Sequence, residues 1–208
     1  MKSKLFLLLS LLSCYTVSAQ LIITPGAHVS ITGNGQLTLQ NTDLINNGSF
    51  ETGKSLISFT GNFSSSISGN QLVQFHELEM NKTNNTSVIL KQAVGVTQRI
   101  LFISGFFDLN GFNTDLGTTG RLENEDETRH VIGANGGQVL LNTILDAPVN
   151  ANPGNLGAVI TSSQNMGNVI IKRRHESQTG SGLIKSLFRY YEIVPEKNNN
   201  LDASLQIN

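Results

Sequence analysis

Carboxylate side chains are most densely grouped in one short segment, at Glu123, Glu125, Asp126 and Glu127. Calcium takes about six to eight oxygen ligands, so a dense acidic segment has to be considered as a calcium-binding loop. The spacing lacks the D-x-[DN]-x-[DN]-G order of an EF-hand, and the nearby His130 is a poor ligand for a hard cation. We therefore interpret the segment as a solvated turn and predict no metal site there.

A second pair of carboxylates, Asp108 and Asp115, would suit glycoside hydrolysis if the fold brought the two together. That reaction needs two carboxyl groups about 5–10 Å apart, one on each side of the scissile bond. Asp108 lies where a strand meets a turn, and Asp115 precedes a Leu-Gly pair. The sequence has no G-x-S-x-G, H-E-x-x-H or P-loop motif. We predict that the chain is not an enzyme and has no catalytic, cofactor-binding or metal-binding residues.

Basic and histidine side chains do not form a recognisable site. The run Lys172–His175 is basic, but on a strand its members alternate between two faces, so we expect an exposed edge rather than a binding patch. The four histidines lack the partner spacing of a zinc site. We expect ordinary surface positions for all of them, namely His28, His76, His130 and His175.

Aromatic side chains give little support to sugar binding, which uses flat aromatic surfaces against the sugar ring. The chain has no Trp, and beyond its first 19 residues the only tyrosines are Tyr190 and Tyr191. Carbohydrate binding stays open as the alternative function.

The composition limits the class of protein. The chain has 208 residues, with 14 Lys+Arg, 15 Asp+Glu and a formal net charge of −1. Charged residues make up 14%, against about 25% in a typical globular protein, and there are 20 Gly and 4 Pro. This polar, weakly charged, turn-rich composition argues against a coiled coil, a helical bundle, a charged disordered tail and a nucleic-acid-binding protein.

Residues 1–19 have the pattern of a signal peptide. Lys2 and Lys4 precede the apolar run Leu5–Leu12, which is too short to span a bilayer, and small residues then lead to a predicted cleavage after Ala19. The mature chain would be secreted or displayed at the cell surface, without a disulfide because Cys14 is the only cysteine. In an alternative interpretation, residues 11–14 form a lipobox and Cys14 carries a lipid anchor.

Residues 20–117 consist of short apolar-alternating runs separated by Asn- and Gly-rich turns. The expected strands are 21–24, 28–32, 36–40, 49–52, 55–60, 73–80, 87–90, 99–103 and 106–109. Strands this short, with few two-residue hairpin turns, favour a right-handed parallel β-solenoid over a β-sandwich. We expect about three strands and about 20–25 residues per turn, with Asn side chains stacked in ladders between equivalent turns.

Residues 118–208 contain longer strands and predict a β-sandwich that is incomplete. The expected strands are 139–145, 157–161, 168–175, 186–194 and 202–207. The last strand reaches almost to Asn208, so we predict that strands are missing and that the chain alone aggregates through its unpaired edges. The fold class is thus all-β, a short solenoid followed by an incomplete sandwich.

Several segments carry a more specific resemblance. They are LINNGSFETG (44–53), ISFTGNFSSSISGN (57–70), FHELEMNKTNNTSVIL (75–90), the run from Leu101 to Gly137, NPGNLGAVITSS (152–163) and the run from Val169 to Ile207. Together they resemble a recurring module of Bacteroidota secreted and surface proteins that are exported by the type IX secretion system. The resemblance implies an N-terminal position, with Ig-like or fibronectin-like modules and a C-terminal sorting domain after it. Because no sorting domain follows here, we expect a fragment or a truncated gene.

These observations lead to one expected function. The chain would be an exported, non-enzymatic structural or adhesive surface module, either a stiff spacer or a support for a polar β surface. The alternative is a carbohydrate-binding or polysaccharide-processing accessory domain. The expected partners are following modules of a longer chain and extracellular glycans or surface ligands, with no nucleic acid and no cofactor.

Overall fold

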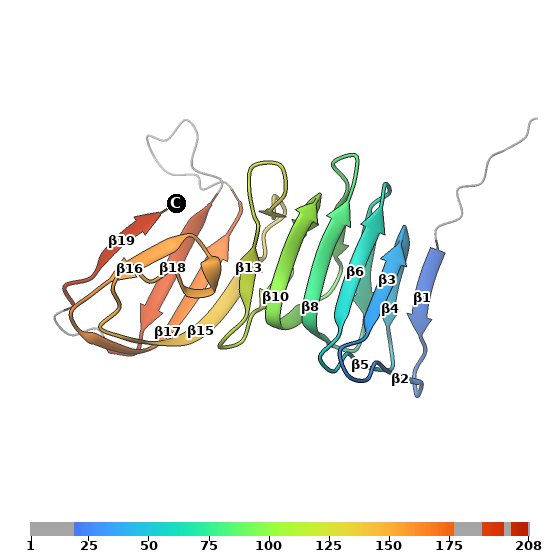
Figure 1. Ribbon diagram of the computed structural model, residues 1–208, viewed down its shortest axis with the longest axis horizontal. Coiled ribbons are helices and arrows are strands. Elements are labelled where there is room, and N and C mark those ends of the chain that lie inside the picture. The colour runs from blue at the N-terminus through green and yellow to red at the C-terminus, as the bar shows by residue number, and fades with distance from the viewer. Residues whose placement is uncertain (1–18, 177–188, 198–200, 208) are drawn as a thin grey trace, which may run out of the picture.

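The computed structural model describes residues 19–176, 189–197 and 201–207. The chain winds through six stacked coils and then adds antiparallel strands at one end, so the colours of Figure 1 run in order along the long axis. The predicted all-β class, with a parallel solenoid followed by further sheets, is confirmed. The predicted signal peptide and Cys14 lie outside the described residues, apart from Ala19.

Each coil gives one strand to a six-stranded sheet and one or two strands to a sheet of eleven strands. The six-stranded sheet contains β1 (Ala19–Ile23), β4 (Thr42–Asn46), β7 (Ser65–Gly69), β9 (Ser87–Leu90), β11 (Phe106–Asp108) and β14 (Val131–Ile132). The solenoid part of the larger sheet contains β2 (His28–Ser30), β3 (Gln36–Gln40), β5 (Ser49–Glu51), β6 (Leu56–Gly61), β8 (Val73–Lys82), β10 (Val94–Ser104), β12 (Asn113–Asp115), β13 (Arg121–Glu123) and β15 (Gln138–Asp146).

The coils stack in parallel register at the predicted repeat length. Hydrogen bonds between equivalent side chains join residues 21 positions apart at Asn41 and Asn62, and 25 apart at Asn110 and Asn135. Three strands per coil are seen in the first, second and fifth coils, whereas β8 and β10 each run through the bend that separates two strands elsewhere. Parallel pairing continues past Gly117, because β13, β14 and β15 pair with β10, β11 and β12.

Inward-facing side chains form continuous rows because parallel register places each above its equivalent in the next coil. One row consists of Leu37, Ile57, Leu78, Ile100 and Leu122, and another of Val29, Phe50, Val73, Val94, Thr114 and Val139. The middle members are fully buried. Burial of such side chains is worth about 1.5–3 kcal/mol each, so the rows supply most of the driving force for stacking.

Asparagine at the turns has two physical roles. Among the residues that the structure describes, seven of the eight non-glycine residues with positive φ are Asn, which tolerates this backbone conformation better than most residues do. The Asn41 side chain also donates to Asn62 and accepts from the Phe63 amide, while it covers Gly61, where a Cβ atom would meet the Asn41 amide. The predicted stacking of asparagines between equivalent turns is seen in two pairs, Asn41–Asn62 and Asn110–Asn135.

The sequence-based prediction missed the short strands β12, β13 and β14. It also missed β4 and β7, which are five residues long. Their residues are TDLIN and SSISG, so each presents few apolar side chains and has weak strand propensity. They form strands because their neighbours in the stack supply hydrogen-bond partners on both sides.

The C-terminal strands extend the larger sheet beyond the solenoid. β17 (Asn165–Arg174) pairs antiparallel with β15, and β18 (Tyr190–Pro195) pairs antiparallel with β17. A 3-10 turn at Pro153–Asn155 leads to β16 (Ala158–Thr161), which pairs with β19 (Ser204–Ile207) in a small separate sheet. Ile160 of β16 is buried in the same apolar cluster as the β17 residues Met166 and Ile171, so the two sheets share one core.

Candidate functional site

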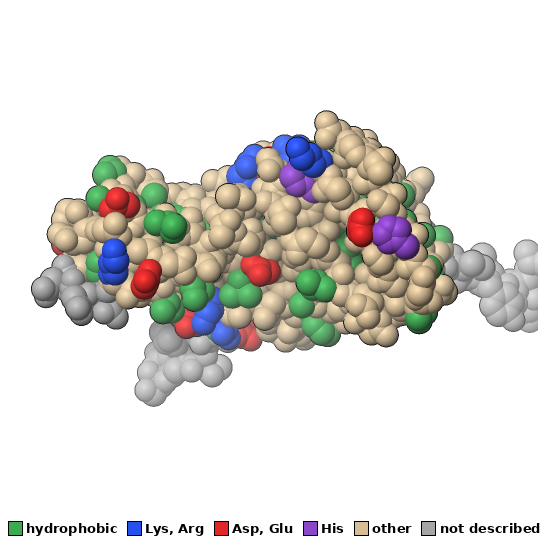
Figure 2. Space-filling model, turned by 90° about the horizontal axis from the view of Figure 1, so that it is seen from below, with side chains coloured by type: hydrophobic (Ala, Val, Ile, Leu, Met, Phe, Trp, Pro, Cys, Tyr) green, Lys and Arg blue, Asp and Glu red, His purple; other side chains and the backbone are tan. Residues whose placement is uncertain are grey.

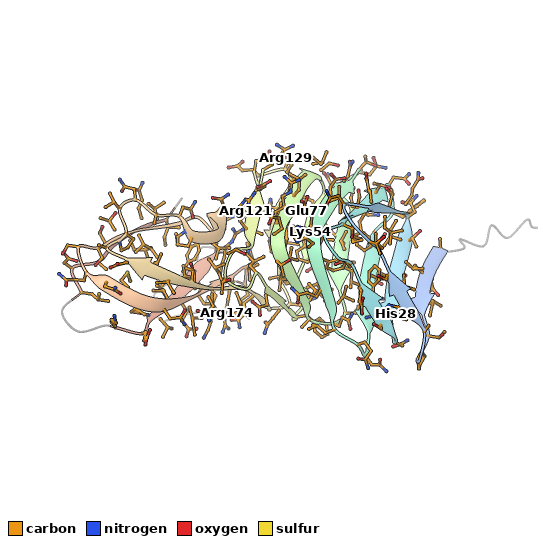
Figure 3. All side chains as sticks on the ribbon, turned by 60° about the horizontal axis from the view of Figure 1, so that its bottom comes forward. His28, Lys54, Glu77, Arg121, Arg129 and Arg174 are labelled. Atoms are coloured by element: carbon orange, nitrogen blue, oxygen red, sulfur yellow. The ribbon has the colours of Figure 1, made fainter. Side chains whose placement is uncertain are left out.

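A row of charged side chains crosses three coils on the outer face of the larger sheet, where Figure 3 shows Glu77 and Arg121 with Lys54 on the same side. Arg99 donates to Glu77 at 2.7 Å and to Glu123 at 3.0 Å, and Arg121 donates to Glu123 at 2.6 Å. The hydrogen bonds to Glu77 and Glu123 raise the pKa of Arg99. Burial opposes ionisation of Glu123, but the bonds from Arg99 and Arg121 hold the pKa of this carboxyl below its usual value. The charged groups of the row pair with one another. The row therefore joins coils and does not provide a carboxylate for acid–base catalysis.

The acidic segment is only partly the solvated turn that we expected. Glu125 points inward and forms two hydrogen bonds with the guanidinium of Arg173, both at 2.8 Å. It also accepts the Val131 amide at 3.0 Å. Burial acts to raise the pKa of Glu125, but the bonds from Arg173 outweigh it and the pKa is lowered. Asp126 stays exposed and accepts bonds from Thr128, which is the expected turn chemistry.

The basic run alternates between two faces as predicted, but the prediction that it is simply an exposed edge is wrong. Arg173 is fully buried, and besides Glu125 it donates to the Leu156 carbonyl at 3.2 Å. Lys172 and Arg174 point to the other face, where Lys172 pairs with Glu192 at 2.8 Å. The inward face of β17 meets the loop after β13, and that burial could not be seen in the local sequence.

His175 is the histidine that departs from the expected surface position, because it is 7% exposed. Its Nε2 accepts the Arg173 Nε–H at 3.0 Å. Burial, followed by the positive charge of Arg173, lowers the pKa of His175 to about 2. A neutral, buried imidazole acts here as a structural acceptor that completes the shell around Arg173, together with Glu125 and Leu156.

Lys82 is a second buried charged residue, which the sequence analysis overlooked. Its side chain is fully buried, and Nζ donates to the Thr60 carbonyl at 2.8 Å and to Ser65 Oγ at 2.9 Å. Burial lowers its pKa to about 8, against the opposing effect of Asp43. The signal was present in the alternation of β8, since Leu78, Met80 and Lys82 occupy successive inward positions.

A groove of about 540 Å³ follows the corner between the two sheets in the first three coils. Its walls are Pro25–His28, Asn47–Phe50 and Gln71–Leu72. At its edge, His28 Nδ1 lies 3.1 Å from Ser49 Oγ, and His28 Nε2 lies 3.8 Å from Glu51. This resembles a Ser-His-acid arrangement in composition only. The same His-hydroxyl contact recurs between His76 and Thr97 at 3.2 Å, which identifies it as a contact between stacked coils.

The two carboxylates considered for glycoside hydrolysis do not form a pair. Asp108 belongs to β11 in the smaller sheet and Asp115 to β12 in the larger one. Asp108 accepts the Asn110 amide at 2.9 Å and Asp115 accepts the Gly117 amide at 2.8 Å. Each carboxylate therefore stabilises its own turn.

The two tyrosines do not form an aromatic platform. They are neighbours on β18 and point to opposite faces. Tyr190 donates to Glu176 at 2.9 Å and lies under Arg174, whose guanidinium carbon is 5.8 Å from the ring centre. Tyr191 donates to the Leu156 carbonyl at 2.5 Å. Both hydroxyls are engaged within the molecule, and Tyr191 shares the Leu156 carbonyl with Arg173.

Within the described parts of the chain, no group of three or more His, Cys, Asp or Glu side chains is placed to hold a metal ion. No helix in those residues is long and apolar enough to span a membrane. Comparisons of the chain with protein-family models, with curated proteins and with solved structures give no match. The charged row, the buried junction and the corner groove are therefore interpreted from their own geometry.

Proposed function

We propose that the chain is an exported, non-enzymatic structural or adhesive surface module that acts as a stiff spacer. One observation carries this proposal. A single hydrogen-bonded sheet runs from β2 in the first coil to β18 beyond the last coil. Bending between the solenoid and the C-terminal strands would break a ladder of nine residue pairs between β15 and β17. A spacer must resist that motion.

The polar contacts support the same function. The charged row of Glu77, Arg99, Arg121 and Glu123 joins successive coils, and the Glu125–Arg173 pair joins the solenoid to β17. The polar side chains with the most restricted geometry thus connect parts of the rod. Export through the signal peptide 1–19, display at the surface by type IX secretion, and the alternative lipid anchor at Cys14 belong to this proposal as its cellular setting.

The spacer function is tested by changing the number of coils. Residues 62–82 form one coil, with β7 and β8, between the equivalent residues Gly61 and Lys82. Duplicating this segment once and twice should lengthen the rod by about 4.8 Å per copy. Small-angle scattering should show the maximum dimension rising in those steps, with a single rigid-rod distribution. A bimodal distribution, with the two parts moving independently, would refute a stiff spacer.

The cellular setting is tested by intact-mass measurement and peptide mapping of both ends of the protein from its source cells. Removal of the signal peptide predicts Gln20 as the first residue. A lipid mass on Cys14 would select the anchored form instead. Peptides that continue past Asn208 would place the module at the N-terminal side of a longer surface protein, as the family resemblance implies.

The corner groove favours one alternative function, the binding of an extracellular glycan. Its volume of about 540 Å³ is within the range of small-molecule sites, about 300–1,000 Å³, and Asn47 and Gln71 bring amides to its walls. A glycan array is the test, with Gln71→Ala as the groove variant and Gln206→Ala, an exposed glutamine on β19, as the matched control. Binding that is lost only with Gln71→Ala would support the alternative, and a flat array would exclude it.

A further inference from the structure

The two ends of the solenoid differ in how their strands are completed. The last coil is continued by β17 and β18. In the first coil, β1, β2 and β3 each pair with one strand only, namely β4, β5 and β6 in the next coil. On their other side, no partner exists within the described residues. A row of backbone N–H and C=O groups is therefore presented along both sheets at this end.

The apolar rows also reach the surface at this end. Leu21, Val29 and Leu37 begin three inward rows, and all three are only half-buried. Their partners one coil further on are 0% exposed at Leu44, 7% at Phe50 and 0% at Ile57. The first coil thus presents an apolar strip bordered by strand edges, which a parallel strand stack ordinarily covers with a cap.

Charge distinguishes this end from the opposite edge. Native proteins protect exposed strand edges with charged residues or proline. β18 follows that rule, with Glu192 and Pro195 in the strand and Glu196 and Lys197 directly after it. Residues 19–42 contain no Asp, Glu, Lys or Arg, although the chain has 29 such residues. In Figure 2, the right-hand end of the molecule, where the first coil lies, shows no Lys or Arg on the visible face.

We propose that the first coil is the interface of a two-fold dimer, in which a second copy of this chain packs its own first coil against it. A two-fold axis perpendicular to the solenoid brings β1, β2 and β3 against strands of the copy that run antiparallel to them. The backbone N–H and C=O groups at the strand edges then gain hydrogen-bond partners. Leu21, Val29 and Leu37 are covered by the corresponding apolar rows of the second copy.

The absence of charged residues from the first coil favours a second copy of the chain as the partner. In a two-fold contact each surface meets its own copy, so any net charge on the coil would repel itself, and residues 19–42 carry none. Head-to-tail stacking would require the far end to accept a coil, but β17 and β18 already cover it. The association therefore closes at two copies instead of growing into a fibre. The proposal does not depend on the spacer function.

Sedimentation velocity on the full chain with its natural N-terminus tests the dimer across a range of concentrations. Wild type should sediment as a reversible dimer. Thr38→Lys and Ile22→Lys place a charge on β3 and β1, at exposed outward positions, and each should weaken dimerisation at least tenfold. Ile144→Lys is the control, since Ile144 is 75% exposed on β15 at the other end, and it should leave the dimer unchanged.

Hydrogen exchange gives a second measurement that needs no variant. The edge amides of β1 and β3 should be protected at concentrations where the dimer forms and should lose that protection on dilution, while β8 stays protected throughout. A monomer at all concentrations would overturn the proposal and leave this end for a different partner. A dimer broken by Ile144→Lys but not by Thr38→Lys, or growth beyond two copies, would overturn it as well.

Discussion

The two ends of the solenoid are built from the same kind of coil but are completed by different means. Within the part of the chain that the structure describes, the first coil has strand edges without a partner and the half-buried side chains Leu21, Val29 and Leu37. The last coil turns into the antiparallel strands β15, β17 and β18, and its surroundings contain the fully buried Arg173. The first coil is held by the repeating contacts of the stack, whereas the other end adds a buried polar lock.

The range of the contacts shows what this difference means. Within the stack, side chains bond to positions 20–25 residues away, such as Asn110 to Leu90 and to Asn135. At the C-terminal junction the partners are farther apart in sequence, at 48 positions for Glu125 and Arg173 and 35 positions for Leu156 and Tyr191. A repeating stack propagates through near neighbours, so its closure requires contacts that the repeat itself does not supply.

Replacement of Arg173 by Met should produce the largest loss of stability at the junction. It leaves the Glu125 carboxylate buried without its partner, which typically costs about 3–5 kcal/mol. The free energy of unfolding in urea measures the effect. The double variant Arg173→Met with Glu125→Met should recover most of the loss, because a buried pair replaced on both sides is often neutral.

Arg174→Met is the matched control for that experiment. Arg174 is the next residue on β17, points to the opposite face, and reaches Glu176 only at 3.7 Å. Its replacement should cost less than about 1 kcal/mol. Equal losses for Arg173→Met and Arg174→Met would show that the buried pair does not lock this end.

The core row beneath the charged face gives the second comparison, because Leu37 and Leu78 are members of the same row in different coils. Leu78 is fully buried, and Leu78→Ala should cost about 2–5 kcal/mol through lost burial and the cavity it leaves. Leu37 is half-buried at the open end, so Leu37→Ala should cost about half as much or less. Urea unfolding of both variants at a protein concentration that favours the monomer is the measurement. A Leu37→Ala loss as large as that of Leu78→Ala under monomer conditions would contradict an open first coil.

The repeat could be predicted well from the sequence because it depends on local residue patterns. Alternation of apolar residues, short strands and Asn-Gly turns specified a parallel stack of about 20–25 residues per coil. The strand of residues 42–46 escaped prediction because its neighbours in the stack, and not its own propensities, make it a strand. Local patterns are thus sufficient to predict the coil, but they do not predict its polar strands.

The candidate site was predicted poorly for the same reason. Asp108 and Asp115 are seven positions apart in sequence, but the bend between β11 and β12 sends them to different sheets. Arg173 was expected on an exposed edge because alternation says which residues share a face, but not which face is covered. Only Lys82 had a readable local signal, as the third inward position after Leu78 and Met80.

Acid should weaken the C-terminal end before it affects the open end. The folded-state pKa of His175 is about 2 and its ordinary value is 6.5, so below pH 6.5 the unfolded chain binds a proton that the folded chain does not. The contribution of His175 to stability is constant above pH 6.5 and should therefore fall by about 1.4 kcal/mol per pH unit as the pH decreases below that value. The lowered pKa of Glu125 adds its own loss only below its ordinary value of 4.5, so the window from pH 6.5 to 5 isolates His175.

His175→Gln checks the assignment, because glutamine keeps an acceptor for Arg173 and does not titrate. Urea unfolding at pH 7, 6 and 5 should show the contribution of His175 to the slope removed in this variant. The control is His28→Gln in the exposed groove of the first coil, which should leave that contribution in place. An unchanged slope in His175→Gln would mean that the imidazole does not stay neutral in the folded protein.

The smallest effect is expected at the exposed charged row, where the chemistry of the Arg173 pair is repeated in contact with water. Arg99 bonds to Glu77 and Glu123, but its side chain is 31% exposed, against 1% for Arg173. Arg99→Met should therefore cost less than about 1 kcal/mol, since exposed ion pairs gain little and are screened by salt. Urea unfolding at low salt and in 0.5 M salt (roughly a 4 Å screening length) should show the Arg99→Met loss shrinking, while the Arg173→Met loss persists. If both losses shrank together, water would reach both pairs, and the distinction between a salt-sensitive row on the coils and a dry lock at the C-terminal end would fail.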